Sequence, residues 1–323
     1  MKITLISALV FLITFSVSAQ MKWQLIDSVR STLPIGVELY TSSGLLDGKP
    51  NRSFYLKVRL KDKNLQFDVD TTLGRRLTPT EYYQRNNLPM VVVNGSFFNF
   101  DKSQNLNVVI KDKKVVGHNL KSVQRKINGK SQKVDIYRSA IGIDNKGKAD
   151  VAWIKTDSSS TKAYASQEMD SIFNIVQSDN KELDKNNKKL WLRKNGFMKW
   201  KMNTAIGGGP VLVQNGQIKI YNQQEKMFDG KEGLTEKHPR TAMGYTANGY
   251  LIILVIEGRN PGIAEGASLV QEAKMLVDLG CTEALNLDGG GSSCMLVNGK
   301  ETITPSDKGL QRPVPAVFLI KSK

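Results

Sequence analysis

One acid, three glycines and two serines stand together in Asp288-Gly-Gly-Gly-Ser-Ser293, directly after an apolar segment that ends at Leu287. Successive glycines permit backbone conformations and close approaches that a side chain would block, and successive N–H groups in such a loop can bind an anion. The alternative is a tight turn in which Asp288 bonds its own backbone. Loops at strand ends present polar groups to ligands, so we favour a site. Its candidate catalytic acid is Asp288, and its candidate binding groups are Gly289, Gly290, Gly291 and Ser292.

Two further charged residues lie at the ends of an expected strand pair. Arg240 precedes a long apolar stretch, and its guanidinium fork suits phosphate or carboxylate oxygens. Glu257 closes that stretch, and an acid that leaves a buried strand must be paired or lie in a cleft. Both are therefore candidate catalytic residues. A salt bridge from Glu257 to Arg259 or Arg240 explains the acid equally well.

Carboxamides and small residues at other strand ends are candidates for binding substrate. The carboxamides of Asn94 and Asn99 suit hydroxyl or amide recognition, because each both donates and accepts. We expect Phe97 and Phe98 to belong to the core, although one ring can form an apolar wall beneath a sugar. The remaining candidates for substrate binding are Gly95, Gly208, Gly209, Thr241 and Glu265.

Other chemistries fail on the residue inventory. The chain has two histidines, His118 and His238, and no Cys-x-x-Cys or His-Glu-x-x-His, so the motifs predict no metal site. A metal held by Asp288 and Glu257 is an open alternative that no motif supports. It has no Gly-x-Ser-x-Gly elbow and no phosphate-loop or dinucleotide spacing, so neither a serine hydrolase nor a cofactor is expected. Cys281 and Cys294 sit beside apolar residues, and we expect buried thiols rather than a disulfide.

The elements that position these residues should be mainly antiparallel strands. Asn-Gly favours the positive φ angles of tight hairpin turns, and it recurs at 128–129, 215–216, 248–249 and 298–299. Leu251 to Ile256 is apolar without alternation, as in a strand covered on both faces. Strands are expected at 53–60, 90–93, 139–143, 149–154, 210–213, 217–221, 250–257, 284–287, 295–297 and 316–320.

Two helices are expected among these strands. Leu269 to Gly280 keeps helical spacing, and Ser268 with Gln271 fits a capping box at its start. Tyr164 to Gln177 is the second candidate, and residues 178–200 look like an exposed excursion. The fold class is therefore α+β, with a mixed, largely antiparallel sheet core, several Asn-Gly hairpins and a few packed helices.

The N-terminus and the net charge indicate the setting. Residues 1–19 have a positive start, an apolar stretch and a small-residue end, as in a secretory signal peptide. We expect an exported protein, periplasmic or extracellular, with no stable membrane insertion. Residues 20–84 should add strands to the domain at 85–323.

The chain has 323 residues and a formal net charge of +16, with basic stretches at 111–114, 121–133 and 181–194. These stretches carry few aromatic residues, which disfavours nucleic acid as a partner. A lysine-rich solvated surface is the simpler interpretation. Attraction to an anionic glycan remains the alternative.

Five segments in this order resemble the phosphodiester glycosidase family. They are Asn94-Gly-Ser-Phe-Phe98, Gly208-Gly-Pro210, Pro239-Arg-Thr-Ala-Met-Gly244, Glu257-Gly-Arg-Asn-Pro-Gly262 and Asn286-Leu-Asp-Gly-Gly-Gly-Ser-Ser293. The resemblance covers about residues 85–320. It implies a glycosidase that cleaves a sugar, GlcNAc-like, from a sugar-1-phosphodiester, with the site at the matching residues Asn94, Arg240, Glu257, Asp288 and Gly289 to Ser292.

This chain departs from the family pattern at three positions. Ser96 stands where glycine is usual, Glu257 where Asp is common and Gln271 where Glu is common. A phosphate leaving group, whose second pKa is roughly 6, can depart with little protonation if Arg and backbone donors stabilise its charge. Asp288 or Glu257 would then act as nucleophile or as base toward water. The alternative function is a carbohydrate-binding or envelope polysaccharide-assembly protein that uses the same pocket without turnover.

Overall fold

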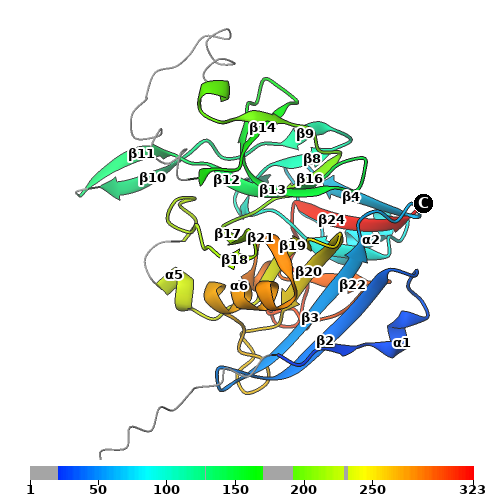
Figure 1. Cartoon of the computed structure of the whole chain (residues 1–323). Coiled ribbons are helices and arrows are strands. Elements are labelled where there is room, and N and C mark those ends of the chain that lie inside the picture. The colour runs from blue at the N-terminus through cyan, green and yellow to red at the C-terminus, as the bar shows by residue number, and fades with distance from the viewer. Residues whose placement is uncertain (1–20, 128, 170–191, 229–231) are drawn as a thin grey trace, which may run out of the picture.

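The computed structural model describes residues 21–127, 129–169, 192–228 and 232–323 (Figure 1). The expected signal peptide and most of the excursion at 178–200 lie outside these residues. Every strand pairing within them is antiparallel, which confirms the expectation of a largely antiparallel core.

The largest sheet has eight strands and carries most of the motif residues at its strand ends. In spatial order its strands are β1 (Gln24–Leu25), β2 (Val37–Leu46), β3 (Lys49–Arg59), β20 (Tyr250–Ile256), β19 (Arg240–Thr246), β21 (Cys281–Asn286), β17 (Val211–Gln214) and β18 (Gln217–Ile218). The central strand β20 is buried along Leu251–Ile256, as its unbroken apolar sequence predicts.

Two further sheets complete the body of the molecule. The seven-stranded sheet contains, in order, β15 (Met198–Trp200), β14 (Ala163–Ser166), β13 (Ala149–Thr156), β12 (Arg138–Ile143), β16 (Thr204–Gly207), β8 (Val109–Lys111) and β9 (Lys114–Gly117). The five-stranded sheet contains β23 (Lys300–Glu301), β22 (Met295–Val297), β5 (Val91–Asn94), β24 (Ala316–Ser322) and β4 (Leu65–Thr71).

Two small sheets and several short helices remain among the described residues. The hairpins are β6 (Phe98–Asn99) with β7 (Gln104–Asn105) and β10 (Ser122–Ile127) with β11 (Lys130–Asp135). The helices are α1 (Asp27–Arg30), α2 (Pro79–Arg85), α5 (Glu232–Thr235) and α6 (Leu269–Asp278). No helix among the described residues is long and apolar enough to cross a membrane.

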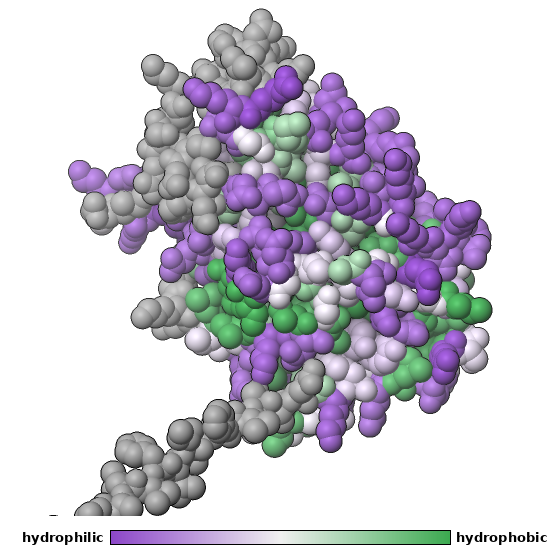
Figure 2. All heavy atoms as spheres, viewed as in Figure 1, coloured by the Kyte–Doolittle hydropathy of each residue, from purple (hydrophilic) through white to green (hydrophobic). Residues whose placement is uncertain are grey.

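The main core lies where the three large sheets meet. It combines Ile253 and Val255 of β20 with Ile141 of β12 and Phe318 of β24. A second apolar cluster packs the opposite face of β20, including Leu254, against Leu276 of α6. Burial of these side chains is the dominant favourable term in folding. In Figure 2, hydrophilic side chains cover most of the visible face, and an apolar stretch lies at the level of α6.

The structure confirms most of the elements that local sequence signals predict. Three of the four Asn-Gly pairs join β17 to β18, β19 to β20 and β22 to β23, and the fourth lies between β10 and β11. Each segment expected as a strand contains one. Helix α6 begins after Ser268, whose hydroxyl accepts from the Gln271 N–H while the Gln271 side chain accepts from the Ser268 N–H. Gln271 therefore performs the capping task that Glu would perform.

The helix expected at Tyr164–Gln177 is wrong over its first residues. Tyr164 lies in β14, where Tyr164 pairs with Lys155 of β13 and with Lys199 of β15. Two neighbouring strands supply its backbone hydrogen bonds, so tertiary pairing overrides the local helical spacing. Residues 170–177 lie outside the described residues. Cys281 and Cys294 are buried free thiols, as expected.

A buried carboxylate joins two of the sheets. Glu225 accepts hydrogen bonds from the Trp153 indole of β13 (3.0 Å), the Val211 N–H of β17 (2.7 Å) and the Ser139 hydroxyl of β12 (2.9 Å). A buried polar network is stable when every member has a partner. Glu225 therefore connects the seven-stranded sheet to the eight-stranded sheet through polar bonds that the apolar core does not supply.

We expect Glu225→Leu to lower the free energy of unfolding by about 3 kcal/mol or more, because four buried donor groups, the Ser139 N–H included, lose their acceptor. The measurement is urea unfolding followed by tryptophan fluorescence and circular dichroism. Trp153→Phe removes one donor and leaves no other donor without an acceptor, so it should lower the free energy of unfolding by less. A loss below about 1 kcal/mol for Glu225→Leu would show that these bonds do not hold the sheets together.

Candidate active site

Part of the motif residues, Asp288 and Arg240 among them, line a pocket of about 490 Å³ at the ends of β19 and β21. One wall is the glycine loop after Asp288, and the others come from the segments that precede β19 and β24 and follow β5, β18 and β20. The lining residues are Phe97, Met227, Phe228, Gly233, Glu236, His238, Arg240, Arg259, Asn286, Asp288, Gly289, Gly290, Gly291 and Arg312.

Backbone hydrogen bonds fix Asp288 at the pocket. The Leu287 N–H donates to Thr241 O (2.7 Å), and the Asp288 N–H donates to Gly95 O (3.0 Å). The Gly290 N–H donates to Pro239 O (2.8 Å). The chain on both sides of the acid is therefore bonded to two other strand ends, which limits how far the carboxylate can move.

The Asn94 side chain supports the same loop. Its Nδ2 donates to the Asp288 backbone carbonyl (2.5 Å), and its Oδ1 accepts from the Thr241 hydroxyl (2.9 Å) and the Cys294 N–H (3.0 Å). Both Asn94 and Thr241 are fully buried. These two predicted substrate-binding residues thus lie beneath the site, where they hold the loop that carries Asp288.

Glycine is required at positions 289–291 because neighbouring groups lie where a Cβ atom would be. A Cβ on Gly289 would lie 2.9 Å from Pro239 O, and one on Gly290 would lie 3.0 Å from an Arg259 nitrogen. A Cβ on Gly291 would collide with Arg312 and Asp307. The expectation of an anion-binding run of free N–H groups is only partly met, because the Gly290 and Ser292 N–H groups donate to chain carbonyls.

Two arginines lie against this glycine loop. Arg312 donates from Nε and Nη2 to the two carboxylate oxygens of Asp307, at 2.7 and 2.9 Å. This bidentate pair fixes the plane of the guanidinium. Arg259 is exposed, has a positive φ of 60°, and its Nη2 lies 3.5 Å from Nδ1 of His238. The pocket thus has two cationic groups within reach of an anion.

Arg240 lines the pocket but is 4% exposed. Its Nε donates to Ala267 O (2.9 Å) and its Nη2 donates to Glu236 O (3.1 Å). Burial lowers the pKa of Arg240, while Glu272 and Glu236 favour the charged form. Several of its donors therefore serve the fold, and Arg259 and Arg312 present more of their surface to the pocket.

Glu257 does not line the pocket. It is 1% exposed, and its Oε2 accepts from the Thr304 N–H (3.1 Å) and lies 3.5 Å from Arg52. The prediction that Glu257 forms a salt bridge with Arg259 or Arg240 is wrong. Arg52 of β3 takes their place because β3 pairs with β20 and the Glu257 N–H donates to Arg52 O.

The predicted binding residues Asn99, Gly208, Gly209 and Glu265 do not line the pocket. Glu265 lies 3.8 Å from Lys49, and Asn99 accepts from the Lys102 N–H. The N–H groups of Gly208 and Gly209 donate to Ser139 O and Asn286 O. These contacts brace the loops that surround the site.

The sequence left open that one ring of the pair Phe97 and Phe98 lines the site, whereas several other lining residues were not expected. Phe97 lies in the pocket, and its ring meets that of Phe228 edge-on with centroids 6.0 Å apart. Phe98 is buried, so only one of the two rings is core. Met227 extends this apolar wall. Glu236 adds a second pocket carboxylate, 3.2 Å from Nε2 of His238. None of Met227, Phe228, Glu236 and Arg312 belongs to a motif.

The carboxyl of Asp288 has a pKa well above that of an ordinary aspartate. Burial raises the pKa of Asp288 to about 7, and the Ser292 hydroxyl, the Arg312 cation and the Gly289 N–H favour the charged form less strongly. The side chain keeps partial contact with solvent in the pocket. A carboxyl that is half ionised near neutral pH can give or take a proton, and perturbed acids of this kind gather at functional sites.

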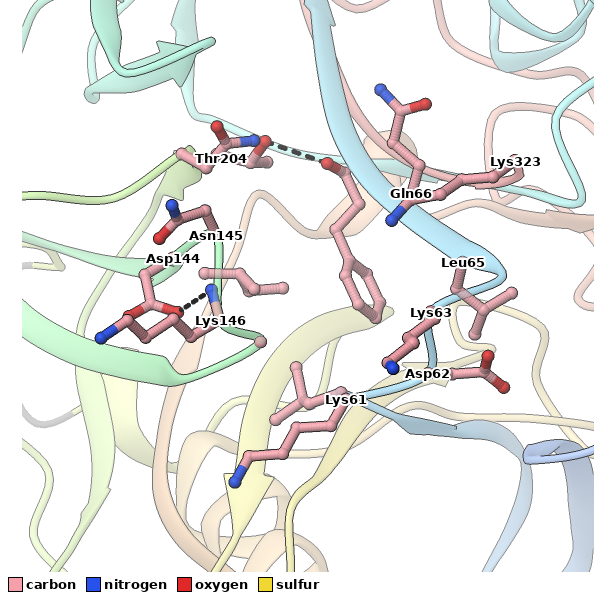
Figure 3. A pocket seen from close by; sticks show the side chains of 15 residues that line it. Lys61, Asp62, Lys63, Leu65, Gln66, Asp144, Asn145, Lys146, Thr204 and Lys323 are labelled. Carbon is pink, nitrogen blue, oxygen red and sulfur yellow. Dashed lines mark hydrogen bonds between the residues drawn. The ribbon is translucent and has the colours of Figure 1, made fainter.

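A second pocket, of about 430 Å³, lies elsewhere on the surface (Figure 3). It is lined by Phe67 and by the turns at 60–65 and 143–147, and its charged groups include Lys61, Lys63, Lys146 and Lys323. Asp144 accepts from the Lys146 N–H there. No motif residue borders it, so the candidate active site remains the pocket at Asp288.

The model of the phosphodiester glycosidase family matches residues 87–321, which is most of the chain. The chain belongs to the phosphodiester glycosidase family. Its relatives include N-acetylglucosamine-1-phosphodiester alpha-N-acetylglucosaminidase from Homo sapiens, 31% identical over 109 residues, and from Bos taurus, 29% over 109 residues. The uncharacterized SPbeta prophage-derived protein YomE of Bacillus subtilis is 38% identical over 81 residues.

These matched stretches are minor parts of the relatives. They span 32% of this chain and 20–21% of the two mammalian enzymes, and 25% of this chain and 12% of the Bacillus protein.

Solved structures share the fold of this family member. The catalytic domain of zebrafish N-acetylglucosamine-1-phosphodiester alpha-N-acetylglucosaminidase, auto-inhibited by its pro-peptide, has a TM-score of 0.59 at 20% identity. That match covers 94% of this chain and 89% of the zebrafish chain. A hypothetical protein from Synechocystis has a TM-score of 0.60 at 15% identity and covers 94% of this chain and 64% of its own.

We expect the Asp288 carboxyl to titrate near pH 7, measured by carbon NMR with Asp288→Asn to identify its signal. The folded-state pKa lies above the value of about 3.9 for an unfolded chain. The protonated acid therefore contributes stability below about pH 4 that is lost as the pH rises toward 7. Asp288→Asn should accordingly gain stability relative to the wild type across that range. Titration near pH 4 would contradict the buried setting of this acid.

Proposed function

We propose that this protein hydrolyses the bond between the anomeric carbon of a GlcNAc-like sugar and the phosphate of a sugar-1-phosphodiester. The observation that supports it best is the pairing of one acid with two arginines across the glycine loop. Asp288 has a raised pKa, and Arg259 and Arg312 lie against Gly290 and Gly291. Membership of the family and the likeness to the mammalian enzymes support the same reaction class.

The phosphate takes the place between Arg259 and Arg312. Guanidinium groups suit phosphate because their planar donors match two oxygens at once. Arg312 is already oriented by Asp307, so little side-chain entropy is lost when an anion binds. Arg240 adds positive charge from behind this pair, and its bonds to Ala267 O and Glu236 O hold it in place.

In the reaction, either water, which gives its proton to Asp288, or the Asp288 carboxylate itself attacks the anomeric carbon, and the bond from that carbon to the phosphate oxygen breaks. In the second case water then hydrolyses the sugar–Asp288 ester. The phosphate monoester leaves with the bonding electrons, and the arginines stabilise the charge that develops on it. This leaving group needs little protonation. The reaction therefore places less demand on a second carboxylic acid than an ordinary glycoside does.

Asp288 acts at the anomeric carbon, either as base toward the attacking water or as nucleophile. Its pKa of about 7 leaves a large ionised fraction at neutral pH, as either role requires. The two roles differ in stereochemical outcome: a base gives inversion, and a nucleophile gives retention. Proton NMR of the first-formed sugar anomer distinguishes them.

The apolar wall takes the sugar ring. Phe97, Phe228 and Met227 lie in the same pocket as the cations. Aromatic rings pack against the C–H face of a sugar, which leaves its hydroxyls for polar groups elsewhere in the pocket. A binding protein without turnover would use the same contacts. The raised pKa of Asp288 favours the enzyme, because binding alone does not need a titratable acid near neutrality.

The setting proposed for this reaction is outside the cytoplasm. The signal-peptide pattern of residues 1–19 supports export. A protein exported by that route meets glycan phosphates in the envelope or beyond, and these are the proposed substrates.

We expect Asp288→Asn to lower kcat/KM for GlcNAc-1-phospho-alkyl esters by about a thousandfold or more. Glu257→Gln should lose less than about tenfold, since Glu257 does not line the pocket. Free sugar release by the purified variants is the measurement, with thermal unfolding to confirm that each is folded. If Glu257→Gln loses as much as Asp288→Asn, Glu257 is the reacting acid. Release unchanged in Asp288→Asn would refute the assignment.

Arg259→Gln and Arg312→Gln should each lower kcat/KM for the phosphodiester by about a hundredfold. The same variants should change the hydrolysis of an uncharged aryl GlcNAc glycoside far less, because that substrate has no phosphate. Arg75→Gln is the matched control, since Arg75 is exposed and borders no pocket wall. Equal losses on charged and uncharged substrates would mean that the arginines support the fold and do not bind phosphate.

A further inference from the structure

The hairpin of β10 and β11 stands apart from the three large sheets. Its strands pair only with each other among the described residues, from Ser122↔Asp135 to Ile127↔Lys130. Figure 1 shows it projecting from the body on the side where α5 lies. In Figure 2 the visible part of this projection is hydrophilic. We name residues 121–135 the basic arm.

The basic arm concentrates positive charge. It has five cationic residues and one carboxylate, and four of the cations are exposed lysines. Within the described residues none of these lysines has a carboxylate within 4.0 Å. Among the residues that the structure describes, no carboxylate therefore pairs with these four charges. The exposed lysines are Lys121, Lys126, Lys130 and Lys133.

A side chain of the arm contacts the segment that leads into the wall of the active-site pocket. Nη2 of Arg125 and Nη2 of Arg138 both donate to the carbonyl oxygen of Lys226, at 3.1 and 3.0 Å. The next two residues, Met227 and Phe228, line the pocket. The arm is therefore bonded to the residue that directly precedes this part of the pocket wall.

We propose that the basic arm binds the anionic chain of a polymeric substrate, a glycan whose sugars are linked by phosphodiesters, while its terminal sugar phosphate occupies the pocket. This inference rests on the proposed function and specifies its substrate class. Repeated phosphates along such a chain complement cations spread along the arm. Interactions of this kind are long-range, act between solvated groups and weaken as salt rises.

The composition of the arm disfavours other polyanions. Its fifteen residues contain no aromatic side chain, and binding of single-stranded nucleic acid depends on aromatic stacking. They also contain no Trp, Phe or Leu, the residues that anchor a basic segment in a lipid surface. A sugar-phosphate chain needs neither kind of contact, because its charge is carried on flexible phosphodiesters.

The test compares two variants that lose the same charge at different places. The arm variant carries Gln at Lys121, Lys126, Lys130 and Lys133. The control variant carries Gln at Lys61, Lys63, Lys146 and Lys323, the lysines of the pocket in Figure 3. Each is assayed on poly(GlcNAc 1-phosphate) and on a GlcNAc-1-phospho-alkyl ester.

At low salt we expect the arm variant to lower the ratio of polymer to small-ester kcat/KM about tenfold. The control variant should leave that ratio unchanged. In roughly 0.5 M salt the wild-type ratio should fall to that of the arm variant, because screening removes the contribution of the arm. An unchanged ratio in the arm variant, or an equal fall in the control, would overturn the proposal.

A binding measurement separates failure of the arm from failure of the proposed function. Asp288→Asn, with and without the four arm substitutions, is titrated with fluorescent poly(GlcNAc 1-phosphate). Weaker binding in the arm variant supports the arm even if no wild-type turnover occurs. Equal binding by both, or tighter binding of single-stranded DNA or of anionic vesicles of equal charge, refutes it.

Discussion

The carboxamide of Asn94 is the contact on which the site depends most. One side chain at the end of β5 bonds the Asp288 carbonyl, the Thr241 hydroxyl of β19 and the Cys294 N–H beyond the glycine loop. It therefore joins the five-stranded sheet to the eight-stranded sheet at the point where the acid emerges. Because these partners are buried, the bonds are shielded from competing water and leave few alternative arrangements.

The pocket built on this contact has two unlike sides. Asp288 and the arginines at the glycine loop are polar, whereas Phe97, Phe228 and Met227 are apolar. The partial burial that raises the pKa of Asp288 also strengthens its attraction to nearby cations, since charges interact more strongly where water is scarce. The proposed cleavage of a sugar phosphodiester needs an acid, cations for the phosphate and an apolar surface for the sugar, and one pocket is lined by residues of all three kinds.

Much of the scaffold could be predicted because its signals are local. Three of the four Asn-Gly turns close hairpins between described strands, and Ser268 with Gln271 sets the start of α6. The strand at Tyr164 could not be predicted, since its backbone hydrogen bonds come from β13 and β15.

In the site, Asp288, Arg240 and the glycines were found from motifs. Arg312 and Phe228 were not, because they reach the pocket from loops distant in sequence and carry no pattern of their own. The partner of Glu257 is Arg52, 205 residues away, and only the pairing of β3 with β20 shows it.

The most direct test of the account is a crystal structure of Asp288→Asn with an uncleaved GlcNAc-1-phospho-alkyl ester bound. We expect the phosphate oxygens to lie within hydrogen-bond reach of Arg259 and Arg312, and the sugar ring to pack against Phe97 and Phe228. The anomeric carbon should lie about 3.5 Å from the side chain at 288. A phosphate bound away from both arginines, or an anomeric carbon nearer to Glu257 or Glu236 than to residue 288, would contradict it.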